Sequence, residues 1–249
     1  HKEYRRQRQM CIRDSYTTKY ETEILAEEQR EGYRAKKLCF NLTGYSRVNA
    51  YVLIPDGEGP FPAVVLLHDH GGHYTIGKEK MIRPFGVDKA VLDDADAWAA
   101  NCYGGQYAGD YLAAHGYVVI SVDALYWGER GRKEGADGSK YADNAGNFMM
   151  LGRSLSAFMN YEDMYTTDYL ATLPEVDPKR IACMGFSMGG YRAWMLSALS
   201  DKIQVGAAIC WMTTTDCQFS WEYGRERGGF ANMLPGIRRY LDYPHIASI

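Results

Sequence analysis

Several features that would assign a functional class are missing from this sequence of 249 residues. No apolar run approaches the roughly 20 residues that a transmembrane helix needs. The net charge of −3 gives no excess of positive charge for binding nucleic acid or an anionic membrane surface. The six cysteines form no Cys-x-x-Cys pair and no spacing typical of metal ligands. We therefore expect no nucleic-acid partner, no membrane association, no metal and no cofactor.

The cysteines and the first residues bear on compartment and domain organisation. Cys183 and Cys210 lie inside apolar, strand-like runs, which predicts buried free thiols and favours a reducing compartment such as the cytoplasm. Residues 1–15 are basic with almost no apolar content, and the composition changes at Tyr16. We expect a non-native or disordered tail over residues 1–15 and a single domain over residues 16–249. A natural start upstream of this tail would leave secretion or a periplasmic location open.

Apolar runs of strand length recur along the domain and alternate with helical patterns. The apolar runs span residues 63–67, 117–122, 180–184 and 205–210. The helical patterns span residues 107–115, 158–173 and 190–199. Continuous apolar runs are typical of parallel strands that are covered on both faces. The alternation predicts an α/β fold, in which helices cover both faces of a doubly wound, mostly parallel sheet.

The remaining segments are less regular. Residues 34–42 and 47–54 read as a β-hairpin, preceded by a charged helix at residues 21–31. Residues 128–146 are rich in glycine, aspartate and charge, which predicts a surface excursion near the mouth of a site. No repeat and no linker divides the chain.

The sequence of residues 185–189, Gly-Phe-Ser-Met-Gly, has the pattern Gly-x-Ser-x-Gly. An apolar strand precedes it and a helical pattern follows it, which is the context in which this pattern forms a nucleophile elbow. Gly185 and Gly189 would permit the sharp turn and the close approach of helix to strand. We predict that Ser187 is exposed at the strand tip as a catalytic nucleophile. The alternative is a glycine-rich turn with an incidental serine.

A serine that attacks an ester carbonyl also needs hydrogen-bond donors for the negative charge that develops on the carbonyl oxygen. In an elbow one donor is the backbone N–H of the residue after the serine, here Met188. The second comes from the loop after a neighbouring strand, here residues 68–73, His-Asp-His-Gly-Gly-His. We predict that His70 or Gly71 supplies this donor, because the glycines let the backbone turn its N–H groups into the site.

Four segments in this order resemble the α/β-hydrolase superfamily, and more closely its dienelactone-hydrolase-like and acetyl-xylan-esterase-like branch. They are residues 66–72, 123–131, 174–181 and 185–190. The resemblance covers about residues 33–249. It implies hydrolysis of carboxylic esters, such as acetyl esters on small molecules or carbohydrates, through an acyl-serine intermediate. In that family an Asp-bearing loop and a His-bearing loop follow the elbow. Residues 244–249 resemble the lead-in to the Asp-bearing strand, so the resemblance implies a fold incomplete at its C-terminal end.

The chain offers substitutes for the acid and base of the relay. His245 is the only histidine after Ser187, and Asp216 follows a strand end where some superfamily members keep their acid. No strand–helix–strand unit separates Asp216 from His245, which favours a loop role for His245.

Two residues before the elbow are further candidates for the cleft. His68 adjoins the predicted oxyanion loop, although a histidine at a strand end is more often a structural residue. Asp123 follows another strand, where it would contact substrate or, as we favour, brace its loop with Glu129 and Arg130 through an ion pair. The spacing of His68, His70 and His73 is poor for a metal site.

Three functions therefore remain open. The first is a serine esterase, of which this chain would be an inactive or weakly active fragment. The second is a non-catalytic ligand-binding module on the same fold, and the third is a peptidase of the same superfamily. An incomplete sheet would also expose a strand edge, which predicts self-association.

Overall fold

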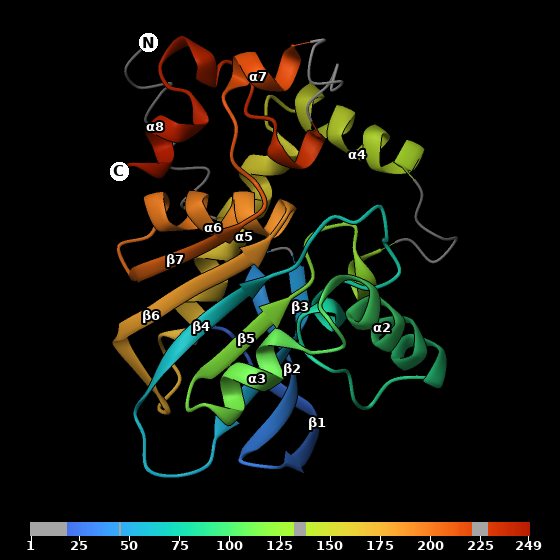
Figure 1. The fold of residues 1–249 in the computed structure, drawn as a ribbon, viewed down its shortest axis with the longest axis vertical. Helices are drawn as coiled ribbons and strands as arrows, with labels where there is room; N and C mark the ends of the chain where they lie inside the picture. Colours follow the sequence, from blue (N-terminus) through green and yellow to red (C-terminus); the bar gives the residue numbers. More distant parts are fainter. Residues whose placement is uncertain (1–18, 45, 132–137, 221–228) are drawn as a thin grey trace.

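The structure, a computed structural model, describes residues 19–44, 46–131, 138–220 and 229–249 (Figure 1). Within these ranges seven strands form one sheet in the order β1-β2-β3-β5-β4-β6-β7. The strands are β1 (Glu23–Arg30), β2 (Tyr33–Thr43), β3 (Ser46–Pro55), β4 (Phe61–Leu67), β5 (Val118–Val122), β6 (Val176–Phe186) and β7 (Ile203–Ile209). The α-helices are α2 (Lys89–Cys102), α3 (Ala108–Ala114), α4 (Gly138–Met150), α5 (Leu155–Leu170), α6 (Met188–Leu199), α7 (Thr215–Phe219) and α8 (Tyr243–Ala247). Short 3₁₀ helices are η1 (Lys78–Lys80), η2 (Gly128–Arg130), η4 (Phe230–Asn232) and η5 (Ile237–Arg239).

The sheet has an antiparallel part and a parallel part. β1, β2 and β3 form an antiparallel meander, and β3 also pairs antiparallel with β5. β5, β4, β6 and β7 run parallel to one another, so their carboxyl ends lie at one edge of the sheet. The predicted hairpin is confirmed, with Arg34 opposite Ile54. The α/β fold class predicted from the alternating pattern is confirmed as well.

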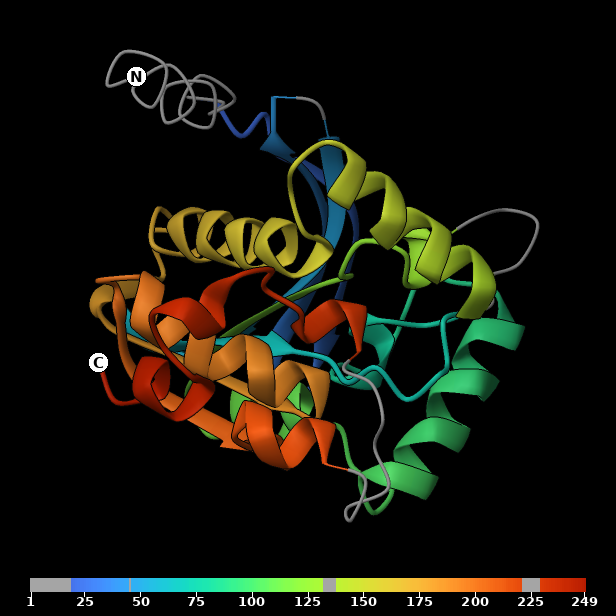
Figure 2. The same ribbon diagram turned by 90° about the horizontal axis from the view of Figure 1, so that it is seen from above.

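Helices cover both faces of the sheet, and Figure 2 shows α5 lying along one of them. The side chains of β4 alternate between these faces, as the period of a strand requires. Val65 and Leu67 pack in the core cluster that α5 and α6 complete. Val64 and Leu66 pack in the cluster on the opposite face, which α3 completes. This burial on both faces explains why β4 reads as a continuous apolar run.

The predicted helix at residues 21–31 is wrong, because this segment forms the edge strand β1. It pairs with β2 in a register that places Glu27 opposite Lys36. The side chain of Arg34 also reaches Glu27, with 3.4 Å between Nε and Oε1. The backbone hydrogen bonds and opposite charges of the partner strand outweigh the helical preference of a glutamate-rich segment. The charged side chains suit an edge strand that must not pair with other molecules.

The other edge of the described sheet is apolar. β7 pairs with β6, and on its solvent side Val205 is 64% and Ile209 43% exposed. Cys210, directly after β7, is exposed, so the prediction that its thiol is buried is wrong, whereas Cys183 on β6 is buried. The sequence pattern of β7 is that of a covered strand, but no described element covers its outer side. Self-association through this edge remains a prediction.

Residues 128–146 are only partly the predicted surface excursion. Gly138–Met150 forms α4, whose Tyr141, Ala145 and Phe148 follow helical spacing and pack into an aromatic cluster. The glycines and polar residues between them hide this spacing in the sequence. Residues 132–137 and the predicted tail at residues 1–15 lie outside the described residues. Among the described helices, none combines the length and apolarity needed to cross a membrane.

Candidate functional site

Ser187 lies at the junction between β6 and α6. Its backbone has φ +56° and ψ −117°, a conformation that a residue with a side chain adopts only when its surroundings enforce it. The amide of Ser187 donates to the carbonyl of Ile209 at 2.8 Å, and its carbonyl accepts from the amide of Tyr191 at 3.1 Å. The side chain is partly exposed, and no hydrogen bond ties its hydroxyl to another described residue. The hydroxyl is therefore free to meet a ligand.

Two glycines make this junction possible. A Cβ atom on Gly185 would lie 2.1 Å from the carbonyl oxygen of Gly189, within the turn itself. A Cβ on Gly189 would lie 1.8 Å from the carbonyl oxygen of Leu67 and 2.9 Å from that of His68. The first turn of α6 thus packs directly against the end of β4, and the space between them has no room for a side chain. The lack of a side chain at Gly189 lets the end of β4 and the start of its loop lie directly beside the first turn of α6.

The loop of residues 68–73 offers backbone donors beside Ser187. In the described residues, the N–H groups of His70 and Gly71 donate to no acceptor. Gly71 has φ +58°, and a Cβ there would lie 2.4 Å from the ring of Trp98. The N–H of Met188 belongs to the first residue of α6, where an amide has no acceptor within the helix. The loop after β4 and the first turn of α6 thus each carry backbone N–H groups that have no acceptor in the described residues.

His68 is fully buried, and both of its ring nitrogens are occupied. Nδ1 lies 2.9 Å from the carbonyl oxygen of Asp69, and Nε2 accepts from the amide of Ala124 at 3.0 Å. Because Nε2 accepts, the proton belongs on Nδ1 and the ring is neutral. Burial, with Arg192 and Lys80 nearby, holds the pKa of His68 well below its ordinary value. His68 ties the ends of β4 and β5 together and has no nitrogen left to act as a base.

His70 is mostly buried among aromatic rings. Its Nδ1 accepts from the amide of Gly72 at 3.0 Å, and its ring lies edge-on to Trp127 and Tyr141 at centroid distances of 5.1 and 5.3 Å. Burial and then the charge of Lys80 lower the pKa of His70 to about 4. The imidazole is therefore neutral near pH 7.

These histidines predict a loss of stability in acid. The unfolded chain takes up a proton at His70 below about pH 6.5, whereas the folded chain does so only near pH 4. The stabilisation from His70 is present above pH 6.5 and is lost between pH 6.5 and 4. His68 acts in the same direction. We expect His70→Asn to lessen this loss by on the order of 2 kcal/mol in urea titrations between pH 7.5 and 4.5.

Asp123 has the opposite effect on acid stability, because burial raises its pKa to about 6 from 3.8. Both the unmodified chain and His70→Asn contain Asp123, so its effect is the same in the two unfolding curves. The comparison of the two unfolding curves therefore isolates the histidine. Parallel curves for the unmodified chain and His70→Asn would contradict the assignment of a neutral, buried His70.

Asp123 belongs to a buried ion cluster. Its carboxylate accepts from Lys78 Nζ at 2.8 Å and from the amides of Lys78 and Glu129 at 2.7 and 3.1 Å. Lys78 Nζ also contacts Glu79 and Glu129, at 2.7 and 2.6 Å. The oxygens of these three carboxylates lie close enough together to hold a metal ion, but the ammonium of Lys78 already contacts all three, and Lys37 also pairs with Glu129 at 2.7 Å. Asp123 thus holds its loop through an ion pair, whose cation is Lys78 and not Arg130.

Asp216 and His245 are held by contacts of their own. Asp216 lies in the first turn of α7, its side chain is 81% exposed, and it contacts Arg238 at 2.8 Å. His245 is exposed, and its Nδ1 accepts from the amide of Asp242 as part of the N-terminal cap of α8. Neither hydrogen-bonds to Ser187. Among the described residues, no histidine hydrogen-bonds to the Ser187 hydroxyl, so these candidates do not form a hydrogen-bonded relay with it.

Sequence reasoning missed two buried lysines in η1. The side chains of Lys78 and Lys80 are fully buried, although lysine is normally exposed. Lys80 Nζ contacts the carboxylate of Asp69 at 3.3 Å. A signal was present, because the two lysines lie in a run flanked by Ile76 and by Met81 and Ile82, which are themselves buried.

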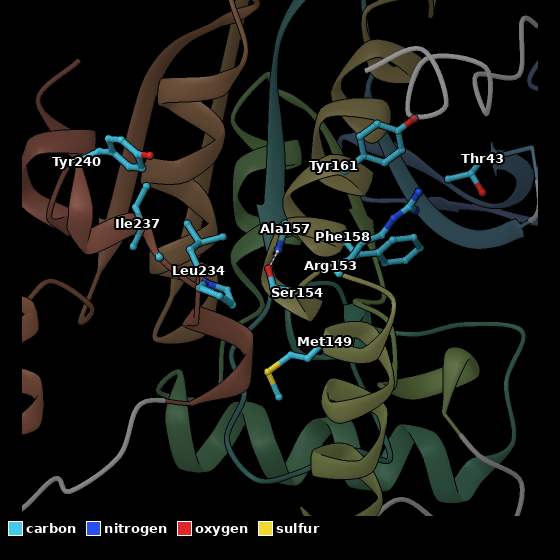
Figure 3. A pocket seen from close by; sticks show the side chains of 13 residues that line it. Thr43, Met149, Arg153, Ser154, Ala157, Phe158, Tyr161, Leu234, Ile237 and Tyr240 are labelled. Carbon is cyan, nitrogen blue, oxygen red and sulfur yellow. Dashed lines mark hydrogen bonds between the residues drawn. The ribbon is translucent and has the colours of Figure 1, made fainter. Parts of the chain in front are cut away.

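A large cavity lies apart from the elbow, between the start of α5 and the segment before α8 (Figure 3). Its volume is about 1020 Å³. Its apolar wall includes Met149, Phe158, Leu234 and Ile237, and Arg153 is its one cationic lining residue. Ser187 and the loop of residues 68–73 are not among its lining residues.

Comparisons with known proteins identify the family of the chain. A model of the Abhydrolase family matches residues 2–248. The Bacillus subtilis (strain 168) protein named "Putative hydrolase YtaP" is 28% identical over 228 residues, which are 91% of this chain and 69% of that protein. A crystal structure described as a "putative acetyl xylan esterase", from Bacteroides fragilis NCTC 9343, superposes with a TM-score of 0.72 at 21% identity.

That superposition covers 98% of this chain but 64% of the esterase, so the chain spans about two thirds of the length of either relative. The structural likeness at this identity concerns the fold alone. The family match and the named relative support a hydrolase. The chain belongs to the Abhydrolase family and has the α/β-hydrolase fold.

Proposed function

We propose that the chain carries the nucleophile and the oxyanion donors of a serine esterase. The observation that carries this proposal is the elbow, where Ser187 holds a strained backbone between β6 and α6 with its hydroxyl free. Strain of this kind at a partly exposed serine is typical of a functional site. The unpaired amides of Met188 and of His70 or Gly71 support the same reading.

In the proposed reaction the Ser187 oxygen attacks the carbonyl carbon of an ester, and its proton passes to a base. The carbonyl oxygen becomes an oxyanion, which the amides of Met188 and of His70 or Gly71 stabilise. Collapse of this intermediate breaks the bond to the alcohol oxygen, which takes the proton back from the base, and leaves an acyl-serine. Water, deprotonated by the same base, then attacks the acyl carbon, and the acid leaves as the serine oxygen regains a proton. No described histidine is in contact with Ser187, so the base and acid are proposed to come from a segment that longer relatives have in addition to the matched region.

The proposed substrates are short-chain carboxylic esters, including acetyl esters on carbohydrates. The rings of Tyr74, Trp127 and Tyr141 pack against His70 and are themselves buried, which places apolar surroundings behind the loop and favours a small neutral acyl group over a charged substrate. The structurally similar protein from Bacteroides fragilis is described as a "putative acetyl xylan esterase", and this description agrees with the proposed substrate class.

The test is hydrolysis of p-nitrophenyl acetate by this chain and by a form extended at its C-terminus. We expect weak turnover by the chain and, in the extended form, a rate at least about 10³-fold above that of its Ser187→Ala variant. Ser200→Ala, at the end of α6, is the matched control and is expected to keep the rate. Equal rates for the extended form and its Ser187→Ala variant would rule the esterase out.

A non-catalytic ligand-binding module is the second candidate, favoured by the lack of a histidine beside Ser187 in the described residues. A fluorophosphonate distinguishes the two, because it labels a serine only when the hydroxyl reacts. Labelling of the extended form at Ser187 supports the esterase. Binding of a carbohydrate ester without labelling supports the binding module.

A further inference from the structure

Lys80 is buried directly beneath the loop that follows β4. Its side chain is fully buried, and its Nζ has three acceptors: the carbonyl oxygen of Asp69 at 3.1 Å, that of His70 at 3.2 Å, and Asp69 Oδ1 at 3.3 Å. An ammonium has three protons, so each is used. Two of the three acceptors are backbone carbonyls of adjacent residues, which an ion pair alone would not require.

The direction of these carbonyls fixes the direction of two amides. A trans peptide unit is planar, with its C=O and N–H pointing opposite ways. The carbonyl of Asp69 shares its peptide unit with the N–H of His70, and the carbonyl of His70 shares its unit with the N–H of Gly71. By binding both carbonyls, Lys80 turns both N–H groups to the opposite side of the loop. These are the two amides that find no acceptor in the described residues.

Two other donors bind the same two carbonyl oxygens. His68 Nδ1 also lies 2.9 Å from the carbonyl oxygen of Asp69, and Trp127 Nε1 donates to the carbonyl of His70 at 3.3 Å. Hydrogen bonds from a cation and a second donor to one carbonyl oxygen polarise the whole peptide unit. The N–H of that unit then becomes a stronger hydrogen-bond donor. The side chains of these three donors, Lys80, His68 and Trp127, are fully buried.

We propose that Lys80 is a positioning residue of the oxyanion site, which orients and polarises the peptide units ending in the amides of His70 and Gly71. This inference rests on the proposed function, because it concerns the charge that develops when Ser187 attacks. Asp69 has a different part. Its carboxylate also accepts from Tyr103 and Trp98, at 2.7 and 3.2 Å, and so anchors the loop from the side. Burial lowers the pKa of Lys80, and the Asp69 charge opposes this.

The test uses phenylboronic acid, whose boron accepts a serine oxygen and becomes a tetrahedral anion that resembles the oxyanion. Formation of this adduct needs the hydroxyl and the amide donors, and ¹¹B NMR detects it. We expect Lys80→Met to weaken Ser187-dependent boronate binding about tenfold, less than the ~10²-fold that follows loss of a donor itself. Asp69→Asn is expected to weaken it less than about threefold, because Lys80 still holds both carbonyls.

Lys89→Met, which removes an exposed lysine at the start of α2, is the matched control and should leave the affinity unchanged. A purely structural ion pair predicts equal losses for Lys80→Met and Asp69→Asn, which would overturn the inference. If Lys80→Met does not fold, the double variant Asp69→Asn/Lys80→Met removes both charges, and the same tenfold loss is expected from it.

The two proposals fail in different ways. Boronate binding that depends on Ser187 but is equal in the folded Lys80 variants overturns the role of Lys80 alone. An unmodified chain whose boronate signal is the same as that of Ser187→Ala overturns the esterase site and the role of Lys80 together.

Discussion

Gly189→Ala is expected to prevent the chain from reaching its native fold, or to lower its melting temperature by about 10 °C or more. The added methyl group would lie 1.8 Å from the carbonyl oxygen of Leu67, which is backbone in the centre of the sheet. Neither α6 nor β4 can move away without breaking the sheet or the elbow. Overpacking commonly costs 1–3 kcal/mol, and contact with backbone on this scale places the cost at about 3 kcal/mol or above. Differential scanning calorimetry measures the effect.

Gly146→Ala is the matched control for this substitution. Gly146 lies in the interior of α4, and a Cβ there would meet no atom within 4 Å. Alanine is the better helix former, so this variant is expected to be more stable by about 0.5 kcal/mol. Equal melting temperatures for Gly189→Ala and the unmodified chain would mean that α6 does not pack on β4 as described.

Asp163→Asn is expected to lower the free energy of unfolding by about 3–5 kcal/mol. Asp163 on α5 and Arg192 on α6 form a two-bonded ion pair, and neither side chain is more than 1% exposed. Removal of the carboxylate charge would leave the guanidinium of Arg192 buried without a counterion. Urea unfolding followed by circular dichroism measures the loss.

The double variant Asp163→Leu/Arg192→Met removes both charges and is expected to recover most of this loss. Asp168→Asn, which disrupts the partly exposed contact with Lys202, is the control and is expected to change stability by less than about 1 kcal/mol. A similar small effect at Asp163 would show that water reaches the buried pair.

The parts of the fold that could be predicted are those whose signal is local. β4 and β5 are apolar throughout because both of their faces are covered, and this pattern is independent of the rest of the chain. β1 could not be predicted from its own residues, since its strand form depends on Lys36 and the other residues of β2 that lie opposite. The exposure of Cys210 could not be predicted either, because it depends on which elements cover the outer side of β7.

The candidate site divides in the same way. The elbow was predictable because its glycines and Ser187 lie within five consecutive residues and their spacing is itself the constraint. The contacts of Lys80 were not predictable, because its partners on the loop lie ten and eleven residues away in the sequence. A lysine in a polar turn also normally faces water. Asp163 and Arg192 likewise read as surface charges of two separate helices, and only the packing of α5 on α6 brings them together.

Two tryptophans touch the loop that Lys80 holds. Trp127 donates its indole N–H to the carbonyl of His70, and the ring of Trp98 lies 4.9 Å from the Lys80 ammonium. Indole emission responds to nearby charge and polarity, so these rings give the loop a built-in optical reporter. Ligands that bind beside this loop and change its polarity should therefore be visible as shifts in intrinsic fluorescence, without a label and without turnover.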